Sequence, residues 1–173
     1  MEIVQINSGL CEKYERKIKT IIFESVHNSH FMDSFTMECA EKKYCELKEY
    51  LRANQAIVYG VIANNELIGF LWGYEFPFRD DKKRIYISVI YIDKAFRGNH
   101  LGAKLLKKIC EYAKKHEYGA IFLHTEAHNL NAQYFYKMMG FKQERIQLVK
   151  YLNEPYNVDV TTGSEKVNCK DTL

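Results

Sequence analysis

A short polar loop with two glycines is the part of this sequence best suited to binding an anion. It reads Arg97-Gly98-Asn99-His100-Leu101-Gly102-Ala103 and leads from a β-branched segment into a helical one. In this position several backbone N–H groups and the positive end of the helix dipole point at one anion. Glycines allow close approach to phosphate oxygens, and Arg97 adds a positive charge. Neither the dinucleotide-binding nor the P-loop glycine pattern occurs, so the loop is either a phosphate site of another type or an ordinary surface turn.

A second segment contains Asn129, Ala132, Tyr136, Gly140 and Phe141, which follow one another at steps of three, four, four and one residues. Together with the loop, it resembles the GNAT superfamily of acyl-CoA-dependent N-acyltransferases. That family's phosphate loop, Q/R-x-x-G-x-G/A, is matched by Arg97 and Gly102, whereas His100 stands where the middle glycine is usual. Its second signature, N-x-x-A-x-x-x-Y-x-x-x-G-F, is matched without a gap.

The resemblance implies acetyl-CoA as co-substrate. Its pantetheine arm is expected between the strands Arg84–Ile92 and Ala120–Thr125, where its amides pair with a strand edge. The N–H of Ile92, or of a near neighbour, is expected to polarise the thioester carbonyl. The residues assigned to the cofactor are Tyr91, Ile92, Arg97, Gly98, Asn99, His100, Leu101, Gly102, Ala103, Asn129, Asn131, Ala132 and Tyr136.

The resemblance also makes Tyr136 the expected general acid. A phenol, with a reference pKa of about 10, can protonate a leaving thiolate without being ionised at rest. The acceptor ammonium, with a reference pKa near 10.4, must first lose a proton. Ser88 stands where many members of the family place a glutamate, so we expect Glu126, ahead of Glu75, to be the base.

Two histidine pairs could suggest a metal, but we expect none. His124 and His128 lie at a strand end rather than on a helix, and His27 and His30 lie near a helix end. Neither pair has a third ligand in view in the sequence.

The expected acceptor is a primary amine on a small molecule or a protein. The aromatic and acidic run 72–81 suits a cation, through ring faces and carboxylates, but equally suits a hairpin with a charged turn. We expect the acceptor pocket to form from His27–Phe31, the third and fourth strands and the chain after Phe141. An aminoglycoside-like compound, a polyamine, an amino sugar, an amino acid and a protein amine all remain open.

Hydrophobic periodicity predicts the order βααβββαβαβ. This order favours an α/β fold with a mixed central sheet flanked by helices on both faces. The resemblance adds that the sheet is mostly antiparallel and splayed between strands 4 and 5. The predicted strands are Glu2–Ile6, Ala56–Ala63, Glu66–Phe76, Arg84–Ile92, Ala120–Thr125 and Phe141–Leu152. The predicted helices are one capped by Ser8 that continues to Val26, then Thr36–Ala53, Ala103–His116 and Leu130–Met139.

Composition sets the remaining expectations. The 173 residues, 47% of them hydrophobic, suit one domain over residues 1–152, followed by a polar tail over 153–173 that leaves a homodimer possible. A net charge of +3, spread along the chain, does not predict nucleic-acid binding. No apolar run or signal peptide is recognisable, and the five cysteines form no C-x-x-C pair. A cytoplasmic protein without membrane partners is therefore expected.

Two other classes of function stay open. A module that binds coenzyme A without catalysis is favoured only by the missing glutamate at Ser88, and Tyr136 argues against it. A structural or interaction protein is favoured only weakly, by basic helix faces.

Overall fold

The described helices and strands of this computed structural model lie in the first of two compact units, Met1–Lys142 and Gln143–Leu173. The described residues are 1–27, 35–77 and 83–148. In chain order the elements are β1 (Glu2–Gln5), α1 (Ser8–Lys13), α2 (Glu15–His27), α3 (Met37–Arg52), β2 (Ala56–Ala63), β3 (Glu66–Phe76), β4 (Arg84–Ile92), the 3₁₀ turn η1 (Lys94–Phe96), α4 (Leu101–Lys115), β5 (Ala120–Leu123) and α5 (Leu130–Met138).

The strands form one mixed sheet in the order β1-β2-β3-β4-β5. The first four are antiparallel neighbours, whereas β4 and β5 are parallel. Asn64 and Asn65, both with positive φ, make the two-residue turn between β2 and β3, which suits the twist of a hairpin. Parallel β4 and β5 need a crossover, which η1 and α4 provide. The predicted mixed α/β sheet is confirmed.

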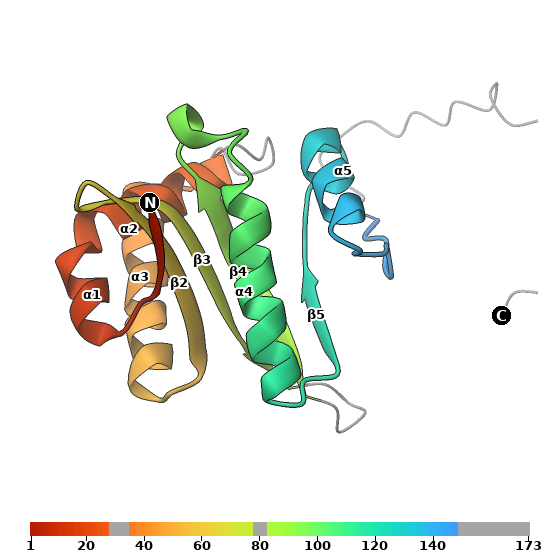
Figure 1. Ribbon diagram of the computed structural model, residues 1–173, viewed down its shortest axis with the longest axis horizontal. Helices are drawn as coiled ribbons and strands as arrows, with labels where there is room; N and C mark the ends of the chain where they lie inside the picture. Colours follow the sequence, from red (N-terminus) through yellow and green to blue (C-terminus); the bar gives the residue numbers. More distant parts are fainter. Residues whose placement is uncertain (28–34, 78–82, 149–173) are drawn as a thin grey trace, which may run out of the picture. The chain divides into compact units, whose positions relative to one another are not determined.

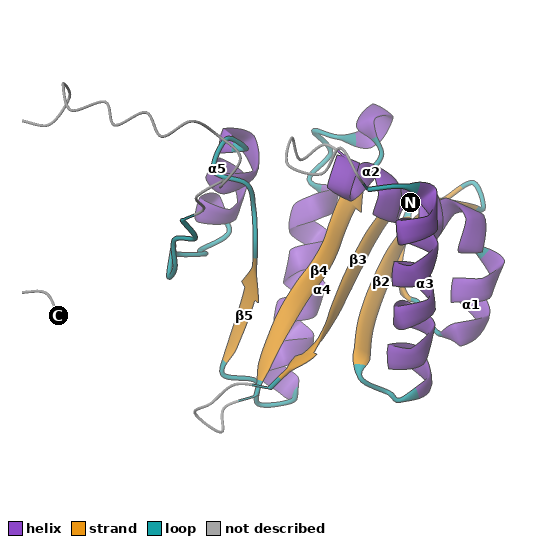
Figure 2. Ribbon diagram, turned by 180° about the vertical axis from the view of Figure 1, so that it is seen from behind, coloured by secondary structure: helices purple, strands orange, loops and turns teal. Residues whose placement is uncertain are grey.

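Helices cover both faces of this sheet, as predicted. Helix α4 lies over one face, and α1, α2 and α3 lie over the other (Figures 1 and 2). Trp72 and Tyr44 are buried on the α1–α3 side. Leu105, Leu106 and Ile109 are buried beneath α4. The sheet therefore has an apolar core on each face.

Strand β4 carries a β-bulge that changes which face its side chains reach. Trp72 pairs with Val89 and Gly73 pairs with Ile87, so Ser88 is an extra residue. Before the bulge, Ile85 and Ile87 pack on the α4 side. After it, Val89 and Tyr91 pack on the α1–α3 side. Since side chains of a regular strand alternate, the extra residue exchanges the two faces.

Near the N-terminus the structure corrects the predicted helix. The helix is interrupted at Tyr14, so α1 and α2 are separate elements. Asn7 rather than Ser8 is the cap, because its Oδ1 accepts the N–H of Leu10 at 2.9 Å.

The predicted final strand Phe141–Leu152 is wrong over its described part, since residues 141–148 contain no strand. An extended segment becomes a strand only when another strand's backbone pairs with it, and none of the described strands does so here. Ile146 and Leu148 are 74% and 90% exposed and contribute little burial. Residues 149–152 lie outside the described residues.

Composition predicted no membrane span and placed most of the cysteines in helices. None of the helices in the described part of the chain is long and apolar enough to cross a bilayer. Cys11, Cys39, Cys45 and Cys110 all lie on helices, with Cys11 fully buried. Burial raises the pKa of the Cys11 thiol, which keeps it protonated.

Candidate functional site

Among the described residues, the edge of β4 that faces β5 is unpaired over half of its length. The pairing of β4 with β5 ends at Ile87 and Leu123, but β4 continues to Ile92. The N–H of Asp93 donates to the carbonyl of Ile68 on the opposite side, at 2.9 Å. Because backbone groups alternate along a strand, the N–H groups of Ile90 and Ile92 point toward the open edge. This edge therefore offers backbone donors to an added strand or an extended ligand.

The two cofactor residues predicted on β4 lie differently with respect to this edge. Ile92 belongs to it, and its carbonyl accepts the Nε–H of Arg97 at 3.0 Å. Tyr91 is buried, and by the same alternation its backbone groups face β3. Its hydroxyl donates to the carboxylate of Glu24, and the Arg97 guanidinium lies 5.8 Å from its ring centre. Arg97 is thus held over the end of β4.

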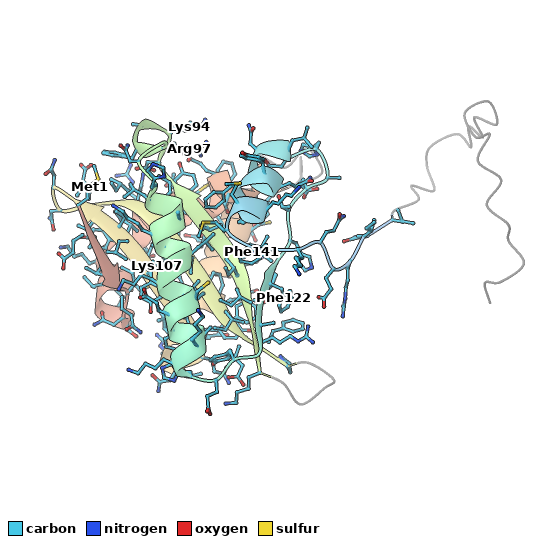
Figure 3. All side chains as sticks on the ribbon, turned by 45° about the vertical axis from the view of Figure 1, so that its right-hand side comes forward. Met1, Lys94, Arg97, Lys107, Phe122 and Phe141 are labelled. Carbon is cyan, nitrogen blue, oxygen red and sulfur yellow. The ribbon has the colours of Figure 1, made fainter. Side chains whose placement is uncertain are left out.

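The predicted phosphate loop leads into α4 with free backbone donors. The first intrahelical bond runs from Lys104 N–H to the His100 carbonyl, at 3.0 Å. The N–H groups of residues 101–103 precede it and have no partner one turn back. No side chain caps this end, and Arg97 and Lys94 lie beside it (Figure 3). The arrangement suits an anion, because these donors and the helix dipole act together.

Helix α5 begins with a side-chain cap and packs near the start of α4. The Oδ1 of Asn129 accepts the N–H of Ala132 at 3.2 Å, which leaves its amide NH₂ to donate to a ligand. Asn131 is exposed and Ala132 is half-buried. A Cβ on Gly102 would lie 3.3 Å from Cζ of Phe135. The small residue in the loop therefore leaves room for a ring of α5.

The spacing of Tyr136, Gly140 and Phe141 is explained by how α5 ends. Gly140 has φ +87°, its N–H donates to Lys137, and the N–H of Phe141 donates to the carbonyl of Tyr136. These two bonds form a Schellman motif, whose usual apolar contact is made by the rings of Phe141 and Tyr136, 5.7 Å apart. The signature thus fixes the ring of Tyr136 at the helix end.

The Tyr136 hydroxyl is in an apolar environment. The residue packs against the core beneath α4, and its ring centre lies 5.4 Å from that of Phe135. Burial raises the pKa of Tyr136 to about 12, because the phenolate would be poorly solvated. No residue in the described ranges hydrogen-bonds to this hydroxyl. The phenol therefore carries its proton throughout the neutral pH range.

The two candidate bases differ in their surroundings. Glu126 is half-buried in the turn between β5 and α5, where its carbonyl accepts Gln133 Nε2 at 3.0 Å. The carboxylate of Glu75 instead accepts the hydroxyl of Tyr118 at 2.9 Å and lies 3.9 Å from Lys83 Nζ. Glu75 is thus committed to a surface network.

The two histidine pairs were predicted to form no metal site. His124 Nδ1 lies 3.3 Å from the Tyr86 hydroxyl. Within the described ranges, no three His, Cys, Asp or Glu side chains are arranged to hold a metal ion. His30 lies outside these ranges.

A cavity of about 690 Å³ lies between α3 and strands β3 and β4. Trp72 and Tyr74 line it, as expected from the run 72–81, whereas residues 28–34 and 78–82 lie outside the described residues. Its charged lining comes from α3, which the sequence prediction missed. Helical spacing places Lys43, Glu46, Tyr50 and Ala53 on one face beside the buried stripe, but it does not show that this face lines a cavity. The complete lining is Lys43, Glu46, Glu49, Tyr50, Ala53, Gln55, Trp72, Tyr74, Tyr86 and Ser88.

The sequence of residues 23–141 matches the acetyltransferase (GNAT) family. The chain belongs to this family. The loop Arg97–Ala103 and the signature Asn129–Phe141 both lie within the matched residues, so the predicted membership is confirmed.

Two curated relatives and one solved structure are similar to the chain. An uncharacterized N-acetyltransferase, YdgE of Bacillus subtilis (strain 168), is 35% identical over 50% of this chain and 55% of its own length. The chain thus spans about half of that relative. The spermine/spermidine N(1)-acetyltransferase of the same strain is 29% identical over 65% of this chain and 68% of its own. The structure of AAC(6')-Iy in complex with a bisubstrate analog of coenzyme A shares the fold, with a TM-score of 0.66, 15% identity and coverage of 87% and 97%.

His100 departs from the GNAT loop pattern, and its backbone has a conformation that glycine adopts without strain. It has φ +57° and ψ +16°, the left-handed conformation, which is costly for a residue with a Cβ. The side chain is exposed and makes no capping hydrogen bond. The histidine therefore occupies a backbone conformation that favours glycine.

Replacing His100 with glycine should stabilise the fold without abolishing coenzyme A binding. Relief of the left-handed conformation, less the entropy that glycine adds to the unfolded chain, should raise the unfolding free energy by about 0.5–1 kcal/mol. Thermal denaturation and calorimetry with coenzyme A measure the two effects. Glu117→Gly is the matched control, since Glu117 has φ +58° at the far end of α4. Loss of coenzyme A binding only in His100→Gly would show that the imidazole, not the backbone, holds the ligand.

Proposed function

We propose that the chain transfers an acetyl group from acetyl-CoA to a primary amine, by direct attack and with Tyr136 as general acid. The observation that carries this proposal is the open edge of β4, because it leads directly into the uncapped start of α4. One continuous segment thus offers donors to a long ligand and then to its phosphates. Membership of the GNAT family supports the same reading.

The residues present fit the parts of acetyl-CoA, which supplies the thioester. The backbone N–H groups of Leu101, Gly102 and Ala103 suit the pyrophosphate, together with Arg97, Gly98, Asn99 and His100 around them. The edge near Ile92 suits the amides of the pantetheine arm, with Tyr91 behind it. Asn129, Asn131 and Ala132 at the start of α5 suit the other side of the arm. The N–H of Ile92, or of its neighbour Ile90, is the donor for the thioester carbonyl.

In the proposed reaction, each proton that is released has a named acceptor. The neutral amine nitrogen forms a bond to the carbonyl carbon of the thioester while the carbon–sulfur bond breaks. Tyr136 gives its proton to the departing sulfur and regains one as the new amide nitrogen loses its extra proton. Glu126 accepts the proton that the ammonium loses before attack. The burial that raises the pKa of Tyr136 keeps the phenol protonated, so it has a proton to give.

An amine on a small molecule or a protein is the proposed partner. Two similarities support an amine: the spermine/spermidine N(1)-acetyltransferase relative and the neighbour bound to an acetylneamine-containing analog. Association into a homodimer stays a proposal.

Thiol release from acetyl-CoA, measured across a panel of amines, tests the proposed function. At least one primary amine should raise the rate well above the hydrolysis seen without acceptor, with one acetylated product per thiol. Tight coenzyme A binding with no acetylation of any amine would favour a binding module without catalysis. An unchanged melting temperature with coenzyme A would favour a structural protein.

Glu126→Gln should flatten the acid limb of the pH–rate profile. The amide cannot accept the ammonium proton, so the rate at low pH should no longer follow ionisation of a carboxylate. Glu75→Gln is the control, because its carboxylate is engaged with Tyr118 and should not affect the limb. If the acid limb is the same in Glu126→Gln and the wild type, the acceptor's own free-amine fraction or a water accounts for it.

A further inference from the structure

We infer that the cavity between α3 and strands β3 and β4 binds the acceptor, and that this acceptor is a primary amine with a second ammonium group. The inference rests on the proposed acetyl transfer and specifies its substrate class. It derives from the position of the cavity, its aromatic wall and its unpaired carboxylates.

The cavity meets the proposed thioester site at Ser88. Ser88 lines the cavity and is also the first β4 residue beyond the last pair with β5, Ile87 and Leu123. Because the bulge lies here, Ser88 and Tyr86 line the cavity on the α3 side, while Ile90 and Ile92 pack toward α4. An amine in the cavity can therefore approach the open edge from the face opposite α4.

One wall of the cavity consists of aromatic rings. Tyr50 and Tyr74 stack with centres 4.6 Å apart, and Tyr74 meets Tyr86 edge to face at 5.5 Å. Trp72 lies behind them, 6.2 Å from Tyr50, and is 1% exposed. Ring faces attract alkylammonium groups and pack against methylene chains. The wall thus suits an aliphatic cation.

Two carboxylates of α3 on the cavity are left without ion pairs. Glu38 and Glu41, elsewhere on α3, pair with Lys42 and Lys19 at 2.9 Å. Glu46 and Glu49 line the cavity and form no ion pair with any described residue. Neighbouring unpaired carboxylates attract a cation. A second ammonium of the acceptor would pair with them.

The remaining charged group of the lining is Lys43. Burial lowers the pKa of its ammonium, while nearby Glu46 opposes that shift. Even with Lys43 fully charged, Glu46 and Glu49 leave the lining with one net negative charge. The volume of about 690 Å³ lies within the usual range for small-molecule sites, so an extended diamine fits.

Fluorescence of Trp72 can report on the cavity directly, because it is the single tryptophan of the chain. Diaminobutane and butylamine are the probes, since they share a carbon chain and differ by one ammonium. Diaminobutane should change the Trp72 emission saturably, with an affinity at least about tenfold higher than that of butylamine. Added salt should reduce this difference, because it screens the charge pair. Equal affinities for the two probes would overturn the inference.

The double variant Glu46→Gln/Glu49→Gln should remove the preference for diaminobutane, because it weakens the binding of this dication more than that of butylamine, which carries a single charge. Glu38→Gln/Glu41→Gln is the matched control, because it changes two carboxylates of the same helix that lie outside the cavity lining. A preference that survives in the first variant contradicts the assignment. Melting temperatures of both variants show whether folding is affected.

The binding measurement uses no acetyl-CoA, so the inference and the proposed function fail separately. If diaminobutane binds at Trp72 and no amine is acetylated, the transfer reaction is wrong and the cavity assignment stands. If butylamine is acetylated with the same kcat/KM as diaminobutane, the substrate class is wrong and the transfer reaction stands.

Discussion

Tyr136→Phe should lower the turnover number by ~10²–10⁴, or roughly 3–5 kcal/mol of barrier, which is the usual contribution of a general acid. The change removes one oxygen and keeps the ring that packs on Phe141. The Michaelis constant for acetyl-CoA should stay within a few-fold. Since the hydroxyl is desolvated and has no partner in the described structure, its loss should leave stability the same or slightly higher. Steady-state kinetics and thermal denaturation measure the two effects.

Tyr134→Phe is the control for this prediction. Tyr134 lies two residues earlier on α5 and is 67% exposed, so the same chemical change should have no effect on turnover. Because the pKa of Tyr136 is raised to about 12, its ionisation should not limit the wild-type rate at any pH near neutrality. Wild-type single-turnover rates in Tyr136→Phe would remove the residue from the mechanism.

Gly102→Glu should abolish coenzyme A binding, with a loss of at least about a hundredfold, or about 2.8 kcal/mol. The new carboxylate would lie in the first turn of α4, where the pyrophosphate is expected. A glutamate there is favourable for the helix dipole, so folding should survive although a Cβ would contact Phe135 at 3.3 Å. Calorimetry with coenzyme A and thermal denaturation check both effects.

Gly102→Gln separates shape from charge. Its side chain has nearly the same size as glutamate and makes the same contact with Phe135. It should bind coenzyme A more tightly than Gly102→Glu, because it lacks the repulsion between the carboxylate and the phosphates. Equal losses in the two variants would mean that disturbed packing of α4 on α5, and not an anion site, explains the effect. Unchanged binding in Gly102→Glu would rule out the loop as the phosphate site.

The sequence predicted most elements of the fold but not the irregularities that shape the site. Strands β2, β3 and β4 were predicted with their observed bounds, since runs of β-branched residues and the Asn64-Asn65 turn mark them clearly. The bulge at Ser88 was not predictable, because it depends on pairing with β3 rather than on local residue preferences. Phe141–Leu152 was predicted as a strand from its apolar residues, yet pairing, which periodicity does not encode, is lacking over its described part.

The candidate site was likewise predicted only in part. The loop and the signature could be found because Gly102, Asn129 and Tyr136 stand at the positions that the two family patterns require. The carboxylates of the cavity were missed, because Glu46 and Glu49 resemble any solvated helix face in the sequence. Only the packing of α3 against β3 and β4 shows that they line a cavity, whereas Glu38 and Glu41 pair with lysines.

The extra residue in β4 also bears on how this chain can vary in length. Ile87 and Val89 already lie on opposite faces of the sheet, as neighbours in a regular strand do. Deleting Ser88 would therefore restore a regular ladder with β3 and leave every later side chain of β4 on its present face. Tyr91 would stay in the α1–α3 core, and Ile90 and Ile92 would stay on the α4 side. Relatives can thus differ in length by this one residue without a second insertion or deletion before the loop.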